Sequence, residues 1–254
     1  MSAVAAVLDA LAEQHAELDT VLAALGDAEW HRPSRCEGWD VADVVLHLAQ
    51  TDELALASAQ GRFAEGLTTL ARGLDGAGNV DDGAAATVAN ERGVPVDALY
   101  ARWRAGAAAI RTALAATDPH ARVDWVAGRL SVHTLAATRL AECWIHTGDV
   151  TDAVGVAVEP TDRLEHVARL AWRTLPYAFA KAGRELRGPV AFSLRAPSGA
   201  PWDFRPETEA ATMVEGPGVE LCLVAARRID PELTALRAEG PDAHAVLELV
   251  RTYA

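Results

Sequence analysis

The feature that most constrains the fold is a helical repeat of apolar residues over the first 155 positions. Four long stretches show it: residues 2–25, 40–59, 95–116 and 131–155. In each stretch, apolar side chains recur every three or four residues, which places them on one face of an α-helix. Four amphipathic helices with these connections predict an antiparallel four-helix bundle.

Residues at the ends of these stretches support the predicted helices. Asp40 can cap the second helix, with Asp43 as the acidic partner of a capping box. Ser131 can cap the fourth helix, and Gly155 suits its carboxyl end. Residues 61–93 are rich in Gly, Asp and Ala, so we predict a long excursion there that contains one short helix.

The pattern changes after Gly155. Residues 162–182 again have helical spacing, and strand-like alternation then appears for the first time. The predicted strands are residues 190–194, 201–204 and 211–214, with helices at 219–228 and 242–253. A turn-rich segment at 196–199 favours a hairpin between the first two strands. We therefore predict an α+β chain of two domains: an all-helical domain at 1–158 and a small α+β domain at 159–254.

Two histidines and a glutamate stand out on two of the predicted helices. Glu142 and His146 are four residues apart, so their side chains lie on one face of the fourth helix. His47 lies in the middle of the second helix. If these helices pack side by side, the three side chains can bind one divalent metal ion and leave the open position that catalytic metals need.

The same residues have simpler interpretations. A Glu–His pair at helical spacing is often a solvated surface pair, and a single histidine on an apolar face is often a hydrogen-bonded core residue. The apolar neighbours of Glu142 and His146 favour the metal site, because a carboxylate among apolar side chains needs a partner.

Charge and composition exclude some classes of partner. The formal net charge is −13, Lys181 is the only lysine, and no run of basic residues occurs. Nucleic-acid binding depends on a basic face, so we expect no nucleic-acid partner. No apolar run has the length of a membrane span, and the N-terminus lacks the basic start and apolar core of a signal peptide. We therefore expect a cytoplasmic monomer or homodimer without a membrane partner.

Three widely spaced cysteines and one aspartate are further candidates for a functional role. The cysteines, which form no disulfide framework, are Cys36, Cys143 and Cys222. Cys36 precedes the second helix and is interpreted as a small packing residue, with a reactive thiolate as the alternative. Asp149, three residues after His146, either accepts a hydrogen bond from its imidazole or is an exposed acid at the helix end.

Two segments resemble a known family. Residues 36–50 read CEGWDVADVVLHLAQ, and residues 139–155 read RLAECWIHTGDVTDAVG. They resemble the mycothiol-dependent maleylpyruvate isomerase family, whose N-terminal domain belongs to the DinB-like metal-binding superfamily. The resemblance implies a DinB-like four-helix bundle followed by a small sterol-carrier-like α+β domain. It implies zinc ligands at His47, Glu142 and His146, and its basic residue near the substrate matches Arg92 best.

The resemblance also implies a reaction and a thiol cofactor, mycothiol. A zinc ion with an open position stabilises a thiol as its thiolate. The thiolate adds to an activated double bond of a small-molecule substrate, the new single bond rotates, and the thiolate leaves, so the net result is cis–trans isomerisation. The same site could transfer the thiol to an electrophile. Two other functions stay open: a thiol-independent isomerase or cyclase, and a non-catalytic small-ligand binder.

Overall fold

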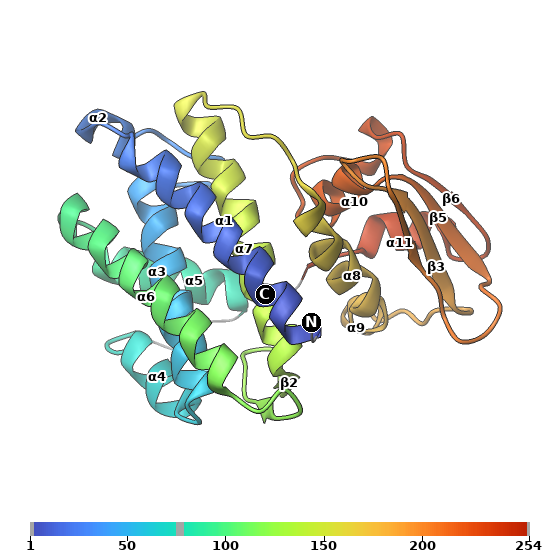
Figure 1. The fold of residues 1–254 in the computed structure, drawn as a ribbon, viewed down its shortest axis with the longest axis horizontal. Helices are drawn as coiled ribbons and strands as arrows, with labels where there is room; N and C mark the ends of the chain where they lie inside the picture. Colours follow the sequence, from blue (N-terminus) through green and yellow to red (C-terminus); the bar gives the residue numbers. More distant parts are fainter. Residues whose placement is uncertain (1–2, 75–78, 253–254) are drawn as a thin grey trace. The chain divides into compact units, whose positions relative to one another are not determined.

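The computed structural model describes residues 3–74 and 79–252. The chain divides into two compact units, Met1–Val158 and Glu159–Ala254. The first unit is mainly helical, and the second combines short helices with a four-stranded sheet (Figure 1). The predicted α+β fold class, a helical domain followed by a small α+β domain, is confirmed.

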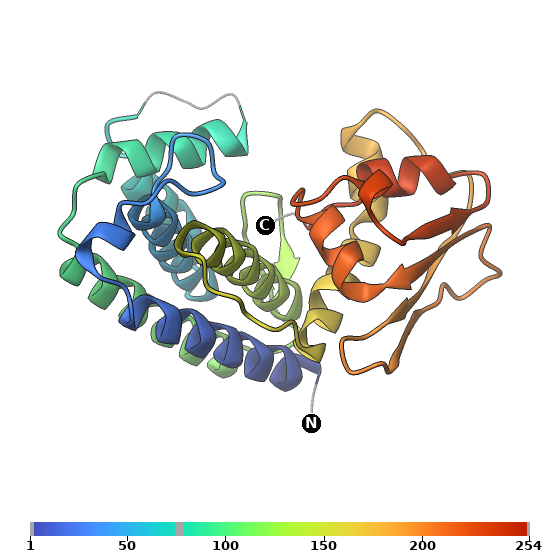
Figure 2. The same cartoon turned by 90° about the horizontal axis from the view of Figure 1, so that it is seen from above.

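Four long helices form the framework of the first unit. They are α1 (Ala3–Ala23), α3 (Val41–Ala59), α6 (Val96–Ala116) and α7 (Val132–Val154). Helix α3 packs against α6 and α7, and α1 packs against the same two helices, which closes the bundle (Figures 1 and 2). The helices that carry the three candidate ligands, α3 and α7, are therefore direct neighbours.

Local sequence signals set the ends of these helices as predicted. The Asp40 carboxylate accepts a hydrogen bond from the backbone N–H of Asp43 (2.9 Å), and the Asp43 carboxylate accepts one from the backbone N–H of Asp40 (3.2 Å). Ser131 caps α7 by accepting the backbone N–H of Thr134 (3.1 Å). Helix α7 ends at Gly155, whose φ of 74° is readily adopted only by glycine.

The bundle core consists of the apolar faces that the helical repeat predicted. Fully or almost fully buried members include Leu18, Val44, Val45, Leu48, Leu99 and Val150. Burying a side chain of this size contributes roughly 1.5–3 kcal/mol relative to leaving it exposed. The cluster therefore holds α3 and α7 together over the length that carries the candidate ligands.

The connections contain more regular structure than the sequence predicted. They include α2 (Asp27–Trp30), α4 (Phe63–Leu70), α5 (Val80–Glu91) and the hairpin strands β1 (Arg122–Val123) and β2 (Leu130–Ser131). In its described residues, 61–74 and 79–93, the excursion thus holds two helices instead of one. Helix α5 was hard to recognise because Thr87 and Val88 are its only buried residues. The side-chain amide of Gln50 on α3 donates to the Thr87 carbonyl (3.0 Å), which holds α5 against the bundle.

The second unit is built on a sheet with the strand order β4–β3–β5–β6. Its strands are β3 (Val190–Arg195), β4 (Pro201–Phe204), β5 (Thr212–Pro217) and β6 (Arg237–Glu239). Strands β3 and β4 form the predicted antiparallel hairpin. Strand β5 pairs in parallel with β3, and β6 pairs antiparallel with β5. The sequence predicted neither β6 nor the parallel pairing.

Short helices complete the second unit. They are η1 (Asp162–Leu164), α8 (Glu165–Arg173), α9 (Leu175–Lys181), α10 (Gly218–Ala225), η2 (Pro231–Leu233) and α11 (Ala243–Leu249). The single helix predicted over 162–182 is interrupted at Thr174, because Pro176 lacks a backbone N–H and its ring crowds the preceding turn.

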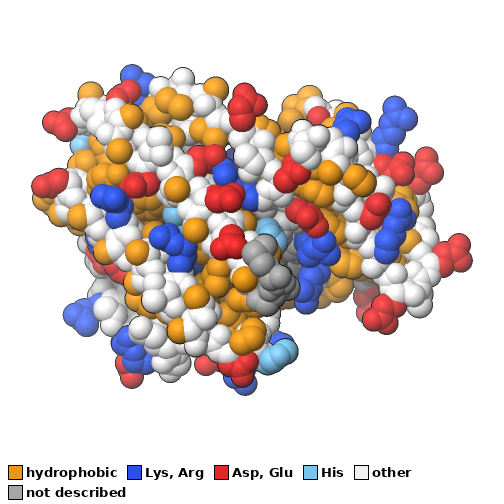
Figure 3. Space-filling model, viewed as in Figure 1, with side chains coloured by type: hydrophobic (Ala, Val, Ile, Leu, Met, Phe, Trp, Pro, Cys, Tyr) orange, Lys and Arg blue, Asp and Glu red, His pale blue; other side chains and the backbone are white. Residues whose placement is uncertain are grey.

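Positively and negatively charged side chains are mixed on one face of the molecule. On the face drawn in Figure 3, Lys and Arg side chains are interspersed with Asp and Glu side chains. Within residues 3–74 and 79–252, no helix is long and apolar enough to cross a membrane.

Candidate metal centre

The structure brings the three predicted ligands together between α3 and α7. Nε2 of His47 lies 3.2 Å from Oε2 of Glu142, and Nε2 of His146 lies 3.6 Å from the same oxygen. One nitrogen or oxygen from each residue lies within 4.8 Å of the others. The two imidazole ring centroids are 5.0 Å apart. The helical spacing of Glu142 and His146 accounts for one pair, and the packing of α3 on α7 adds His47.

The residues present fit a divalent metal ion. Two imidazole nitrogens and one carboxylate oxygen form a donor set that zinc commonly uses in catalytic sites. All three side chains are largely buried, with exposed fractions of 11% for both histidines and 14% for Glu142. Nδ1 of His47 is buried without a hydrogen-bond partner, so nothing in the described chain competes for the orientation that turns Nε2 toward Glu142.

The protonation of this cluster is strongly coupled. Burial alone would raise the pKa of Glu142, but hydrogen bonds from His146 and His47 hold it well below its usual range. Burial alone would lower the pKa of His146, but hydrogen bonding to Asp149 and Glu142 raises it well above its usual range. Burial lowers the pKa of His47, and its hydrogen bond to Glu142 only partly opposes this. In protein without a metal ion, hydrogen bonds therefore hold protons between Glu142 and the two histidines. A divalent cation bound at this place would replace those protons.

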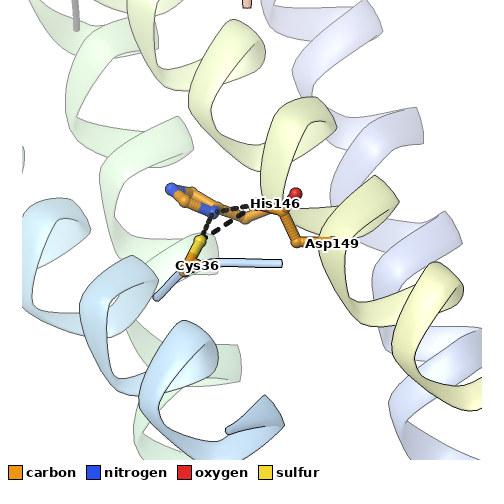
Figure 4. A group of neighbouring side chains, drawn as sticks. All are labelled: Cys36, His146 and Asp149. Carbon is orange, nitrogen blue, oxygen red and sulfur yellow. Dashed lines mark hydrogen bonds and ion pairs between the residues drawn. The ribbon is translucent and has the colours of Figure 1, made fainter. Parts of the chain in front are cut away.

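The far side of the His146 ring faces two further polar groups (Figure 4). Nδ1 of His146 lies 2.9 Å from Oδ2 of Asp149, and since an ionised carboxylate can only accept, Nδ1–H is the donor. The Cys36 thiol donates to the same oxygen at 3.4 Å, and its sulfur lies 4.0 Å from Nδ1. Asp149 is only 1% exposed, so the interpretation as an imidazole partner fits and that of an exposed helix-end acid does not.

Cys36 packs against the apolar core, as the interpretation as a small packing residue implies, but it is partly exposed and also belongs to the surroundings of His146. The loop that carries it folds back through a bridge between Pro33 and Asp40 and a hydrogen bond from the backbone N–H of Val41 to Arg32. No periodic pattern in the sequence reports such a contact, and the only signal was a cysteine just ahead of a capped helix.

One aromatic residue covers the ligand on α3. The Trp39 ring lies 5.2 Å from the His47 ring, tilted by 48°. Trp39 lies just before the cap of α3, where it is partly buried and packs against the apolar core of the bundle as well as against His47.

Arg92 follows the end of α5 and pairs with Asp43, which lies one helical turn before His47 on α3. Its guanidinium forms two hydrogen bonds with the Asp43 carboxylate, Nε to Oδ1 at 2.9 Å and Nη2 to Oδ2 at 2.7 Å. Nη2 also donates to the Gly38 carbonyl at 3.0 Å. Its side chain is half exposed. An anionic group of a substrate would therefore have to displace Asp43 or approach through Nη1.

A buried polar layer, which sequence reasoning missed, lies one turn below the ligands. Arg139 is 1% exposed, and its Nε donates to Oδ1 of Asp52 at 2.9 Å. Its Nη2 donates to the hydroxyl of Thr51 at 2.9 Å, and that hydroxyl donates to the backbone carbonyl of His47 at 2.8 Å. His15, also buried, faces Asp52 at 3.9 Å. The polar layer thus connects α1, α3 and α7 directly beside the candidate metal centre.

Comparisons with known proteins agree with this architecture. A family model described as the mycothiol maleylpyruvate isomerase N-terminal domain matches residues 11–151. Uncharacterised proteins from two strains of Mycobacterium tuberculosis are 32% identical over 241 residues, which is 94% of this chain and 91% of theirs.

Solved structures share the fold over almost the whole chain. The crystal structures of the mycothiol-dependent maleylpyruvate isomerase and of a single-site mutant of it superpose with a TM-score of 0.60 at 19% identity. The match covers 94% of this chain and 95% of theirs. At this identity the likeness establishes the fold, whereas the family model and the mycobacterial relatives establish kinship. The chain therefore belongs to the mycothiol-dependent maleylpyruvate isomerase family.

Proposed function

We propose that the chain is a metal-dependent enzyme that acts on a small electrophilic substrate with mycothiol as its thiol cofactor. The reaction is a cis–trans isomerisation or a thiol transfer, and we place it in the cytoplasm, where thiols are kept reduced. The observation that carries the proposal is the convergence of His47, Glu142 and His146, whose donor atoms lie within 4.8 Å of one another. Membership of a family defined by a mycothiol-dependent isomerase supports the choice of thiol.

Each residue has a stated part. His47, Glu142 and His146 would hold a zinc ion, which when bound supplies a Lewis acid that favours the thiolate form of a thiol. Asp149 accepts the Nδ1–H of His146 and so turns Nε2 of that ring toward Glu142. Trp39, whose ring lies against that of His47, would give an apolar contact to the substrate.

The reaction class places limited demands on the protein. A thiolate that adds to an activated double bond and later leaves is regenerated, so the chain needs no nucleophile of its own. The described residues must exclude water, keep the substrate in place while the single bond rotates, and hold the charge that develops on the activating group. Arg92 is our proposed partner for that anionic group, because a planar guanidinium suits a carboxylate.

The test combines metal analysis with turnover. Purified wild-type protein should contain one zinc ion per chain and should convert an activated cis-alkene such as maleylpyruvate only when mycothiol is present. His146→Ala should lose both zinc and turnover. His133→Ala, which removes a histidine from the same helix outside the donor group, is the matched control and should keep both. Retention of stoichiometric zinc by His146→Ala would refute the proposed ligand set.

The outcome without thiol separates the alternatives. Full turnover in a thiol-free preparation would refute the thiol mechanism and would favour a thiol-independent isomerase or cyclase on the same bundle. Zinc binding without turnover of any electrophilic alkene, together with retention of a small apolar molecule, would favour a non-catalytic binder.

Arg92 requires its own control because of its ion pair. If Arg92 binds the substrate anion, Arg92→Ala raises KM, whereas Asp43→Asn, which weakens the ion pair but leaves the guanidinium, does not. If Arg92 only ties α5 to the start of α3, the two variants have the same effect. Equal effects on KM and kcat in both variants would therefore reject a substrate role.

A further inference from the structure

His146 stands between two sets of potential metal donors. Its Nε2 faces Glu142 and His47. Its Nδ1 faces Cys36 and Asp149, as Figure 4 shows. The proposed function uses only the first set. The second set combines a thiol, an imidazole nitrogen and a carboxylate, three ligand types that zinc and related ions bind together.

The distances in the second set suit a single ion. Nδ1 of His146 and Oδ2 of Asp149 are 2.9 Å apart, Sγ of Cys36 and Oδ2 are 3.4 Å apart, and Sγ and Nδ1 are 4.0 Å apart. A zinc-like ion sits about 2.0 Å from nitrogen or oxygen and about 2.3 Å from sulfur, so it can join donor atoms up to about 4 Å apart. Asp149 is buried, while Cys36 is partly exposed and gives a path from solvent.

We propose that Cys36, Asp149 and Nδ1 of His146 form a second cation position that prefers thiophilic divalent ions. It is an alternative to the first position, because a neutral imidazole has one nitrogen lone pair. The inference rests on the proposed function only in that both positions use His146.

The exchange between the two positions follows from the tautomers of His146. When Nδ1–H donates to Asp149, the lone pair of Nε2 faces the first position. When the proton is on Nε2, it can be donated to Oε2 of Glu142, 3.6 Å away, and the lone pair of Nδ1 faces Cys36. Binding at the second position releases two protons to solvent, the Nδ1 proton of His146 and the thiol proton of Cys36, and nitrogen–metal and sulfur–metal bonds replace the N–H and S–H bonds.

The kind of ion decides which position is occupied. Thiolate is a soft donor, so cadmium and other thiophilic ions gain most from Cys36. The first position has only nitrogen and oxygen donors and does not distinguish soft ions in this way. An excess of a thiophilic ion would therefore withdraw His146 from Glu142 and His47, and the second position would inhibit the first.

The test uses two probe ions on metal-free full-length protein. Cadmium(II) should produce a thiolate-to-cadmium charge-transfer band in the ultraviolet, and cobalt(II) should give visible bands without a thiolate contribution. Cys36→Ser should abolish the cadmium band, lower the cadmium affinity at least about tenfold, and leave cobalt binding unchanged. Glu142→Gln should do the reverse, since it weakens cobalt binding but keeps the cadmium band.

Two further variants complete the design. His146→Ala should weaken the binding of both ions, because both positions use its ring. Cys222→Ala, which changes a fully buried cysteine of the other unit, is the control and should leave both spectra unchanged. Circular dichroism verifies that each variant is folded.

The results separate failure of this inference from failure of the proposed function. Cadmium binding without a thiolate band, or a band that persists in Cys36→Ser, would refute the second position and leave the first intact. Unchanged cobalt binding in Glu142→Gln would refute the proposed metal centre, while a Cys36-dependent cadmium band would still establish the second position.

Discussion

Mild acid should destabilise this protein through one buried histidine. His15 on α1 is 4% exposed, and its Nδ1 accepts a hydrogen bond from Arg111 on α6 (2.6 Å), so the ring proton is on Nε2 and the ring is neutral. Burial, opposed by Asp52 and reinforced by Arg111 and Arg139, lowers the pKa of His15 from 6.5 to about 4. The folded state therefore resists a proton that the unfolded chain accepts readily.

The sign and size of the effect follow from this difference. Above pH 6.5 neither state binds the proton, and His15 adds no pH dependence. As the pH falls from 6.5 toward 4, only the unfolded state gains the proton, so the free energy of unfolding decreases. The decrease from this residue is about 2 kcal/mol at pH 5 and approaches about 3 kcal/mol below pH 4, since each pKa unit corresponds to about 1.4 kcal/mol.

Urea unfolding of metal-free protein at a series of pH values measures this effect. Far-ultraviolet circular dichroism follows the transition, because it reports chiefly on the helical unit. His15→Asn keeps an acceptor for Arg111 but replaces a buried ring with a smaller side chain, and we expect it to be less stable than wild type at pH 7.5. Because asparagine does not titrate, the free energy of unfolding of this variant should fall by about 2 kcal/mol less than that of wild type between pH 7.5 and pH 5. The ligand histidines titrate equally in both proteins and cancel in the comparison. Parallel pH profiles for the two proteins would refute a buried neutral His15.

The remaining predictions concern residues around the ligands. Asp149→Asn weakens the acceptor that faces His146, so zinc affinity, measured by competition with a chromophoric chelator, should fall about 10–100-fold; unchanged affinity would show that Asp149 does not orient the ring. Arg139→Met leaves Asp52 buried without its partner and should lower the free energy of unfolding by about 3–5 kcal/mol in urea. Arg139→Met should also lower the zinc affinity. The double variant, Asp52→Leu with Arg139→Met, should regain much of the lost stability but not the zinc affinity. Full recovery of zinc affinity in the double variant would contradict a positioning role of the polar layer.

The helices and the ligand pair on α7 were predictable because they depend on local patterns. Period and capping identify α3 and α7, and a spacing of four residues places Glu142 and His146 on one face. That His47 lies within 3.2 Å of Glu142 depends on the packing of two helices, which the bundle topology made a reasonable prediction. The Glu142–His146 pair thus follows from local helix geometry, whereas the position of His47 follows from the tertiary packing of α3 on α7.

Contacts between segments without a periodic pattern could not be predicted. Cys36 reaches His146 because an irregular loop folds back on itself, and no apolar spacing encodes that path. Strand β6 has only three residues and no buried position, so it lacks the alternation that identifies strands. The parallel pairing of β3 with β5 joins segments separated by another strand, which hairpin signals do not report.

The buried polar layer was missed for a different reason, and that reason bears on function. Charged residues in a helical repeat are assigned to the solvent face, yet α7 is buried by neighbours on several sides and Arg139 is enclosed with Asp52. A buried ion pair adds little net stability over a well-packed apolar pair. It forms only when the two helices that carry it are aligned in one particular way. Arg139 lies three residues before Glu142, and Thr51 lies four residues after His47, and a hydrogen bond joins their side chains. We infer that this hydrogen bond sets the axial register at which the two ligands meet, so that the polar layer acts on the geometry of the candidate metal centre more than on the stability of the bundle.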